Sequence, residues 1–419
     1  MLVYLSEWLS LIIRWFHVIA GVAWIGASFY FVWLDNNLRE PPAWKKQKGI
    51  KGDLWAIHGG GFYEVAKYEV GPEQMPSDLH WFKWEAYSTL LSGLALLAVV
   101  YYMGNPGYLI DPSKLALSGA GAVAIGVGTL VAVVALYEAL IRSPLARNGM
   151  AFGVVLYLIL VAVAFGLYQV FAGRGAYIHV GAVIGTIMVG NVFLGIVPAQ
   201  RALVNAVARG EKPGAEVVML AQRAMLRSRH NNYLTLPVLF IMISNHYPMF
   251  YANAYGWAVL AAIGAITAYA RHFFNLRNQG QFKPSILVVS ALATVALIWA
   301  MAPSAPARID SHAAEEVAAV TRVADADISQ LLATHCQACH AVKPTSPAFQ
   351  APPAGIVLDS LEHLQQHRDK VYQAAVATEY MPLGNMTGIT PEERDLLGKW
   401  LQENPEPRAR SGVPVFCDL

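Results

Sequence analysis

The chain has 419 residues, of which 56% are hydrophobic and only 14% are charged, with a formal net charge of +2 and three cysteines. A typical soluble domain is about 25% charged, so this composition excludes a disordered chain and a disulfide scaffold and argues against a single soluble domain. The near-zero net charge gives no indication of nucleic-acid binding, and we expect no nucleic-acid partner.

Residues 1–302 contain apolar stretches of the length that a transmembrane helix needs, about 20 residues. The first stretch is too long for a signal peptide and has no basic segment before it, so we expect it to remain as the first helix. The pattern predicts a polytopic bundle of about eight transmembrane helices. The eight stretches, in chain order, are 8–34, 83–103, 115–141, 150–171, 177–198, 233–250, 254–274 and 284–302.

The connections between these stretches differ strongly in positive charge. Counted together with Arg271 near the end of the seventh stretch, the odd-numbered connections carry 17 Lys and Arg residues, whereas the even-numbered ones carry only Lys114 and Arg174. Because cytoplasmic loops are enriched in Lys and Arg, the odd connections are predicted to be cytoplasmic. Eight spans then place both termini outside, which in a bacterial inner membrane means the periplasm.

The composition changes abruptly after residue 302. Residues 303–325 begin with the sequence PSAPA and read as a linker, and residues 326–419 are polar, with no segment long enough to span a membrane. A short helix is expected over 327–334, and a second helix is predicted to begin after Thr390, with Pro391 at its first position. The tail is therefore predicted to be a small, separate all-α domain.

The tail contains the motif C-x-x-C-H at Cys336, Cys339 and His340. In such a motif the two thiols form thioethers to haem, and the histidine is the proximal iron ligand. The alternatives are a thioredoxin-like redox pair, which requires a βαβ context that the tail lacks, or a chance match. The motif predicts one covalent haem c in a class I-like cytochrome c domain. Haem c is attached to proteins outside the cytoplasm. This motif and the Lys and Arg count therefore place the tail on the same side of the membrane.

The sixth iron ligand is expected on the loop before the last helix. Both Met381 and Met386 lie there, and the M-P-x-x-N pattern favours Met381, with Met386 as the alternative. Methionine and histidine together raise the reduction potential of a haem, so this group would accept electrons readily. The third cysteine, Cys417, has no predicted role beyond that of a free terminal thiol.

Histidines near the predicted spans form two groups. His17, His179 and His246 are expected toward the outer side, where they either ligate a haem b or are interfacial residues hydrogen-bonded to neighbours. The inner group includes His58 and His80. His58 precedes three consecutive glycines, which either allow a ligand to approach the backbone or form a flexible turn.

A set of polar residues at the inner side supplies low-specificity candidates for a general base. Glu64 and Lys67 are three residues apart, and we expect them to share one face of a helix. The full set of candidate catalytic residues is His58, Glu64, Lys67, His80 and Glu85.

Several stretches carry a resemblance to a known family. These are RWFH (14–17) through WIG (24–26), HGGGFY (58–63), WFKWE (81–85), HNNY (230–233), SNHYP (244–248) and, in the tail, C-x-x-C-H with MPLGN (381–385). On these residues the chain resembles the membrane-bound urate hydroxylase (urate oxidase) family over nearly its whole length. The segment from His17 to Gly26 is also similar, over a short stretch, to haem b-binding helices of a bacterial protoporphyrinogen oxidase family and of copper-resistance membrane proteins.

The resemblance implies an enzyme that oxidises urate to 5-hydroxyisourate in purine degradation. Residues 1–302 would be the transmembrane urate-oxidising domain and 326–419 the periplasmic cytochrome c domain. Electrons would pass through haem c to a soluble cytochrome c or a terminal oxidase, with membrane lipid as the surrounding partner. Urate loses two electrons and haem c takes one at a time, so a second carrier or two successive transfers are needed. An arginine clamp on the anionic purine is also expected.

Two other functions remain open from the residues. The chain could be a non-catalytic electron-transfer subunit that passes electrons from a donor such as quinol to a periplasmic cytochrome. It could also be a protoporphyrinogen-oxidase-like enzyme. Reduction of the haem by urate, or by quinol alone, separates these alternatives.

Overall fold

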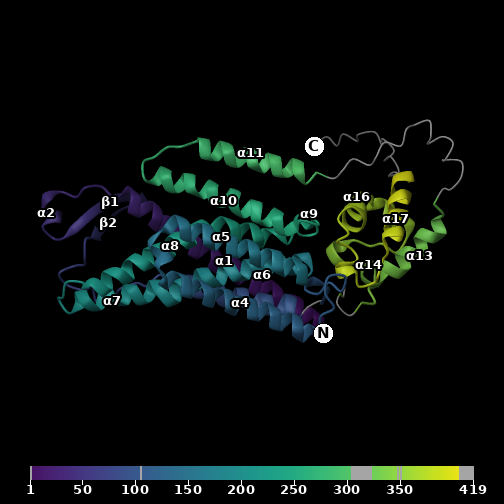
Figure 1. Ribbon diagram of the computed structural model, residues 1–419, viewed down its shortest axis with the longest axis horizontal. Coiled ribbons are helices and arrows are strands. Elements are labelled where there is room, and N and C mark those ends of the chain that lie inside the picture. Colours follow the sequence, from purple (N-terminus) through teal and green to yellow (C-terminus); the bar gives the residue numbers. More distant parts are fainter. Residues whose placement is uncertain (1, 104–105, 303–322, 347–348, 350–351, 405–419) are drawn as a thin grey trace, which may run out of the picture.

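The computed structural model describes residues 2–103, 106–302, 323–346, 349 and 352–404. Cys417 and residues 303–322 of the predicted linker lie outside them. Figure 1 shows an elongated bundle of helices, with a β-hairpin at one end and a small group of short helices at the other end.

Within the described ranges, six helical segments are long and apolar enough to cross a membrane. The main elements of the bundle are α1 (Leu2–Asn37), α3 (Trp84–Leu97), α4 (Gly119–Arg142), α5 (Gly149–Val170), α6 (Gly173–Asn191), α7 (Val197–Ala208), α8 (Ala215–Ser244), α10 (Gly256–Asn278) and α11 (Ser285–Ala300), with the short helices α2 (Ala43–Lys46) and α9 (Pro248–Tyr251). π-Helical turns extend α3 over Ala98–Tyr102 and join α6 to α7 over Val192–Ile196. Short 3₁₀ turns cover Pro106–Tyr108 and Pro144–Arg147.

Six of the eight predicted spans correspond to helical segments that are long and apolar enough to cross a membrane. The predicted span 233–250 falls in the second half of α8 and continues into α9, while the first half of α8 carries charged residues that lower its hydropathy. The predicted span 284–302 corresponds to α11, a helix of 16 residues. Both helices run along the bundle beside α10 (Figure 1).

The centre of the bundle is α6. In the continuous helical segment Gly173–Ala208, of which α6 is the first part, 56% of the most apolar stretch is buried, against 28% or less in the other candidate spans. Small residues allow this close approach: a Cβ on Gly181 would lie 2.6 Å from Cγ2 of Ile241 on α8. The large apolar core therefore forms where α4, α5 and α8 pack around α6.

The first connection contains an antiparallel hairpin, β1 (Ile50–His58) with β2 (Gly61–Tyr68). Its turn is Gly59-Gly60, and both residues have positive φ, as a two-residue type I′ turn requires. The expectation of one helix face for Glu64 and Lys67 is therefore wrong. Residues three apart on a strand point to opposite faces, and the aromatic and β-branched residues of 62–65 favour a strand.

The tail folds as a small helical unit, in agreement with the all-α prediction. It contains α13 (Asp325–His335), α14 (Gln337–His340), α15 (Leu361–Gln366), α16 (Arg368–Val371) and α17 (Pro391–Glu403), with a π-helical turn at Tyr372–Ala377 and 3₁₀ turns at Pro353–Gly355 and Leu383–Asn385. The buried Trp400 on α17 donates a hydrogen bond from Nε1 to Asp325 at the start of α13, 2.8 Å away.

Candidate functional site

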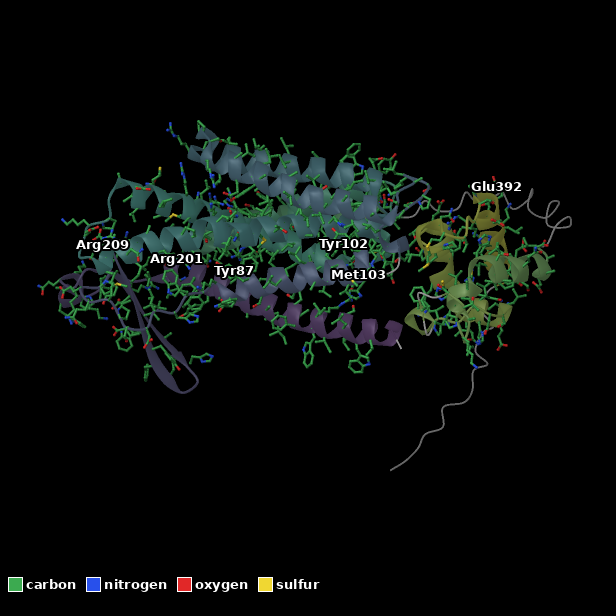
Figure 2. The ribbon with its side chains drawn as sticks, turned by 90° about the horizontal axis from the view of Figure 1, so that it is seen from below. Tyr87, Tyr102, Met103, Arg201, Arg209 and Glu392 are labelled. Carbon is green, nitrogen blue, oxygen red and sulfur yellow. The ribbon has the colours of Figure 1, made fainter. Side chains whose placement is uncertain are left out.

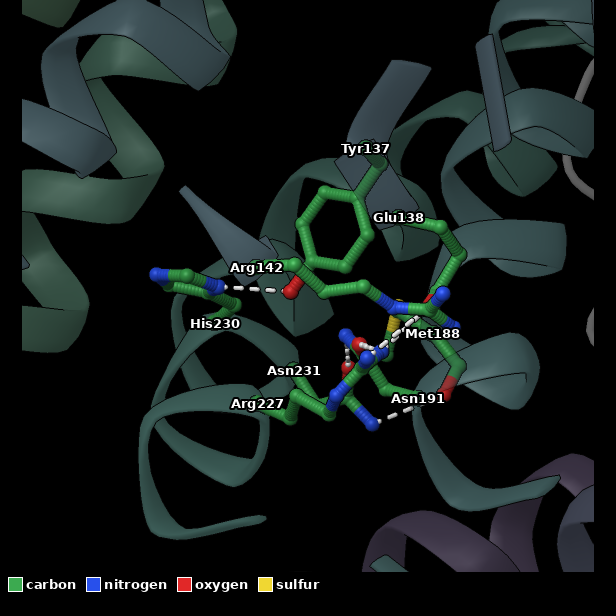
Figure 3. A network of polar contacts seen from close by, with 8 residues as sticks. All are labelled: Tyr137, Glu138, Arg142, Met188, Asn191, Arg227, His230 and Asn231. Carbon is green, nitrogen blue, oxygen red and sulfur yellow. Dashed lines mark hydrogen bonds and ion pairs between the residues drawn. The ribbon is translucent and has the colours of Figure 1, made fainter. Parts of the chain in front are cut away.

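The most connected polar network in the bundle joins α4, α6 and α8, and Figure 3 shows it at close range. Its centre is Arg227 on α8, whose side chain is only 5% exposed. Arg227 donates two hydrogen bonds to the carboxylate of Glu138 on α4, at 2.5 and 2.8 Å. A paired carboxylate is what permits a guanidinium to remain charged inside an apolar bundle.

Two asparagines extend this network toward the centre of the bundle. Arg227 also donates to Oδ1 of the fully buried Asn191 at the end of α6, 2.9 Å away. Asn191 in turn donates to Asn231 at 2.9 Å, and Asn231 donates to the carbonyl oxygen of Met188 at 2.9 Å. Both asparagine side chains therefore have partners for a donor and for an acceptor, and the network is fixed in one arrangement.

The local helix geometry makes room for the arginine. The π-helical turn that begins after Asn191 contains Gly195, and a Cβ at this position would collide with the Cδ and Nε atoms of Arg227. Single-turn π-helices are frequent at functional sites because they re-aim side chains. Here the turn ends α6 with Asn191 aimed at Arg227 and leaves space for the guanidinium.

His230 lies one turn after Arg227 on α8 and is 6% exposed. Its Nδ1 is 2.7 Å from the hydroxyl of Tyr137 on α4, and its ring stacks on Phe152 of α5 with centroids 4.6 Å apart. Its Nε2 is buried and has no hydrogen-bond partner among the described residues. An unpaired buried imidazole nitrogen is costly, so this atom is free for a proton or a ligand.

A second polar contact joins α8 to α10 next to this network. Tyr233 lies 2.7 Å from Nδ1 of His272, and Arg271 donates to Asn232 at 3.1 Å. The guanidinium of Arg271 also lies 4.0 Å from the ring centre of Phe29 on α1. All four residues of the sequence stretch 230–233 therefore hold α8 to its neighbours.

The predicted catalytic candidates do not gather at one place. Glu64 pairs with the buried Lys45, which also pairs with Asp53, while Lys67 pairs with Asp35 at 2.7 Å. These ion pairs fasten the hairpin to α2 and to the end of α1. Both carboxylates raise the pKa of Lys45, Asp53 more strongly than Glu64.

The other three candidates lie outside these ion pairs. His58 is exposed beside the hairpin turn. His80 lies before α3 with its ring against Phe82, at a centroid distance of 4.5 Å. Glu85 is in the first turn of α3.

The outer histidines also lie apart. His17 has Nδ1 3.0 Å from the hydroxyl of Ser92 on α3. His179 is fully buried, with Nδ1 2.7 Å from the carbonyl oxygen of Gly175 and Nε2 3.0 Å from the hydroxyl of Tyr102. His246 is exposed in the turn that follows α8. Among the described residues, no contact joins the three rings, and both ring nitrogens of His179 are occupied.

The tail brings the residues of the C-x-x-C-H motif to one side of its core. Cys336 and Met381 pack against the same buried cluster, which includes Leu332, Leu397 and Trp400. Burial raises the pKa of the Cys336 thiol to about 12. Nδ1 of His340 lies 2.8 Å from the carbonyl oxygen of Ile356, a contact in which the ring donates its Nδ1 hydrogen and leaves Nε2 as the free nitrogen.

Sequence reasoning missed Arg227 and Asn191 as site residues. Arg227 was counted only as a charge of a cytoplasmic connection. One signal was present: Arg227 and His230 are three residues apart and share a helix face with Asn231 nearby. The partners on α4 and α6 could not be identified from the sequence, since Glu138 and Asn191 are 89 and 36 positions away.

The fold and these sites define a helical bundle, with six helical segments of membrane-spanning length and apolarity among the described residues, joined to a small helical domain that carries C-x-x-C-H. Residues 3–302 match the family model for the urate oxidase N-terminal domain, and the chain belongs to this family. Searches of curated proteins and of solved structures gave no significant match.

Proposed function

We propose that this protein is a membrane-bound urate hydroxylase that delivers its electrons to a haem c in its own tail. The observation that carries the proposal is the family match, which spans the whole helical bundle, residues 3–302. In this reaction urate and one water give 5-hydroxyisourate, two protons and two electrons. A soluble cytochrome c or a terminal oxidase takes up the electrons from the tail.

The residues of the tail fit a covalent haem c. Cys336 and Cys339 would form the thioethers, and His340 would ligate the iron through Nε2, since its Nδ1 is oriented by the carbonyl of Ile356. When bound, the haem supplies a one-electron carrier, so urate oxidation requires two successive transfers or a second carrier.

The surroundings of the two methionines support Met381 as the second axial ligand. Met381 packs on the core cluster that also contacts Cys336. Its carbonyl oxygen accepts a hydrogen bond from Arg394 at 2.6 Å, which holds the loop in place. Met386 is half exposed, away from that core.

The residues proposed for a haem b do not fit one. His179 could ligate iron only if its Nε2 left the hydroxyl of Tyr102, because its Nδ1 is already hydrogen-bonded to Gly175. His17 is hydrogen-bonded through Nδ1 to Ser92, and the described residues show no contact that brings its ring to that of His179. We therefore propose that urate is oxidised by two successive one-electron transfers to haem c, without a second haem.

The proposed topology is a multi-pass protein of the bacterial inner membrane, in which α8 supplies the sixth span and α11 the eighth, in addition to the six apolar segments. Figure 2 supports this sidedness, because Arg201 and Arg209 lie at the end of the bundle remote from the tail, whereas Tyr102 and Met103 lie at the end next to it. The basic end would face the cytoplasm and the tail the periplasm.

The test uses the purified full-length protein with oxidised haem c under anaerobic conditions. We expect urate to reduce the haem and the double variant Cys336→Ser, Cys339→Ser to lose urate-dependent reduction of added cytochrome c. Reduction by quinol but not by urate would assign the chain to electron transfer alone. Reduction by protoporphyrinogen but not by urate would support the other alternative.

A further inference from the structure

A cavity of ≈ 370 Å³ lies where the membrane bundle meets the tail. One wall comes from the bundle and includes Tyr168, Arg174 and Tyr251, and the other comes from the loop around Tyr380. The rings of Tyr251 and Tyr380 meet edge to face, with centroids 5.3 Å apart. The cavity is therefore built by both domains and is lined by aromatic side chains suited to a planar ligand.

The charged residues of the cavity leave a cationic excess. Lys114, Arg174 and Arg394 line it together with two acids, Asp111 and Glu379. Lys114 donates to the carbonyls of residues 168 and 171, and Arg394 donates to those of residues 375 and 381. Among the described residues, no carboxylate forms an ion pair with any of the three cations, so an anion would be attracted here.

Arg174 has both Nη groups without a hydrogen-bond partner among the described residues, whereas Arg394 uses one of its Nη groups for two backbone carbonyls. Its Nε donates to the hydroxyl of Tyr101 at 3.3 Å, and its guanidinium lies 4.2 Å from the ring centre of Tyr108. The Tyr101 hydroxyl donates in turn to Asn245 at 3.0 Å. These contacts fix the plane of the guanidinium, and the only hydrogen bond among them is donated by Nε. The two Nη groups can therefore donate a bidentate pair of hydrogen bonds to an anionic ligand.

The wall from the tail shows two further features of a binding site. Glu379 and Asn385 adopt positive φ values of 50° and 46°, which are rare for residues other than glycine and which cluster at functional sites. In addition, Oδ1 of Asn385 is buried and has no hydrogen-bond partner in the described part of the chain, although its Nδ2 donates to the carbonyl of Ile389 at 3.2 Å. A buried acceptor without a partner is unfavourable, and a ligand that carries an N–H donor would satisfy it.

We propose that this cavity binds the urate anion, with Arg174 pairing with its oxygens and the tyrosine rings enclosing its plane. The inference rests on the proposed function and names the site of the same substrate. Urate is planar and anionic and carries both N–H donors and carbonyl acceptors, which matches the free Nη groups and the unpaired Asn385 oxygen. The site also adjoins Met381, the next residue after Tyr380, so the ligand lies beside the loop that would hold the haem iron.

The test measures equilibrium binding of radiolabelled urate to the full-length protein with its haem kept reduced, so that no turnover occurs. Arg174→Gln is expected to weaken binding at least tenfold, and Arg174→Lys to restore part of the loss as a single-point cation. Arg209→Gln is the matched control, since Arg209 lies at the opposite end of the bundle and pairs with Glu211.

A second variant, Ala254→Trp, keeps the site assignment testable even if Arg174→Gln does not fold. Ala254 lines the cavity and is exposed, so Ala254→Trp fills the space without removing a contact. It is expected to abolish binding while the haem spectrum stays that of the wild type. The site assignment is overturned when the wild type binds and oxidises urate and both Arg174→Gln and Ala254→Trp keep the wild-type Kd within twofold. A wild type that neither binds nor oxidises urate overturns the proposed function itself.

Discussion

Glu138 meets two arginines in very different surroundings. Arg227 is buried and bonds both carboxylate oxygens, whereas Arg142 is 68% exposed and lies 3.5 Å from one of them. A buried ion pair is costly to break because the remaining charge stays in an apolar environment, whereas an exposed pair contributes little.

This contrast predicts a large difference between two substitutions of the same residue type. Arg227→Met is expected to lower the free energy of unfolding by about 3–5 kcal/mol, whereas Arg142→Met should change it by less than about 0.5 kcal/mol. Thermal unfolding of the detergent-solubilised protein measures both. Equal losses in the two variants would show that Arg227 does not hold the bundle together. The double variant Arg227→Met, Glu138→Leu should recover much of the loss.

Glu393 provides a pH dependence in the tail. Its carboxylate accepts the backbone N–H of Thr390 at 2.8 Å, and this hydrogen bond is the main reason that its pKa lies below the usual value of 4.5. Because the folded-state pKa is the lower one, the stabilisation is present above pH 4.5 and is lost as the pH falls through the folded-state pKa.

The Glu393→Gln variant should therefore lose less stability than the wild type on going from pH 6 to pH 3. Glu392→Gln, in the same first turn but without the capping contact, is the control and should follow the wild type. The melting temperature of the tail, monitored through the haem absorbance, gives the comparison. Parallel pH profiles for Glu393→Gln and the wild type would refute the role of the capping box.

At the scale of the elements, the π-helical turn of 192–196 positions Asn191 and makes space for Arg227. Gly195→Ala places a methyl group on the guanidinium stem, and overpacking of this kind costs about 1–3 kcal/mol. Gly190→Ala, five residues earlier on α6, meets nothing within 4 Å and should be neutral or slightly stabilising. Unfolding temperatures of the two variants test this, and a neutral Gly195→Ala would mean that Arg227 has another way to fit.

The elements that were predictable from the sequence are those with local signals. Thr390, Pro391 and Glu393 predicted the start of α17, and the structure contains the full capping box. The hairpin is not among the predicted elements, because the glycines after His58 were interpreted as either a ligand-binding stretch or a flexible turn of a long loop, although Gly59-Gly60 between alternating residues is also a signal for a hairpin turn. The Arg227 network could not be predicted, since it depends on how α4, α6 and α8 pack.

At the scale of the whole molecule, one end of the bundle carries the basic connections and the other end carries the tail (Figures 1 and 2). Sequence charge alone predicted this sidedness, because the bias in Lys and Arg is a property of whole connections and needs no packing information. The cavity between the bundle and the tail was not predictable, since its walls come from segments more than 200 residues apart, such as Arg174 and Tyr380.

The topology makes a direct prediction for reporter fusions. Alkaline phosphatase, which is active only outside the cytoplasm, should be active when fused after Leu419 and inactive when fused after Gly280, in the turn between α10 and α11. A reporter that is active only in the cytoplasm should give the opposite pattern. Activity of alkaline phosphatase at Gly280 and not at Leu419 would reverse the orientation.

The central claim is that electrons from urate enter haem c of the same chain. The most direct measurement is an anaerobic titration of the fully oxidised protein with urate, following the haem c absorbance and the urate consumed. The account predicts two haem groups reduced for each urate oxidised, because urate loses two electrons and each haem accepts one. Urate consumption without haem reduction, or no reaction with urate while a chemical reductant reduces the haem fully, would contradict it.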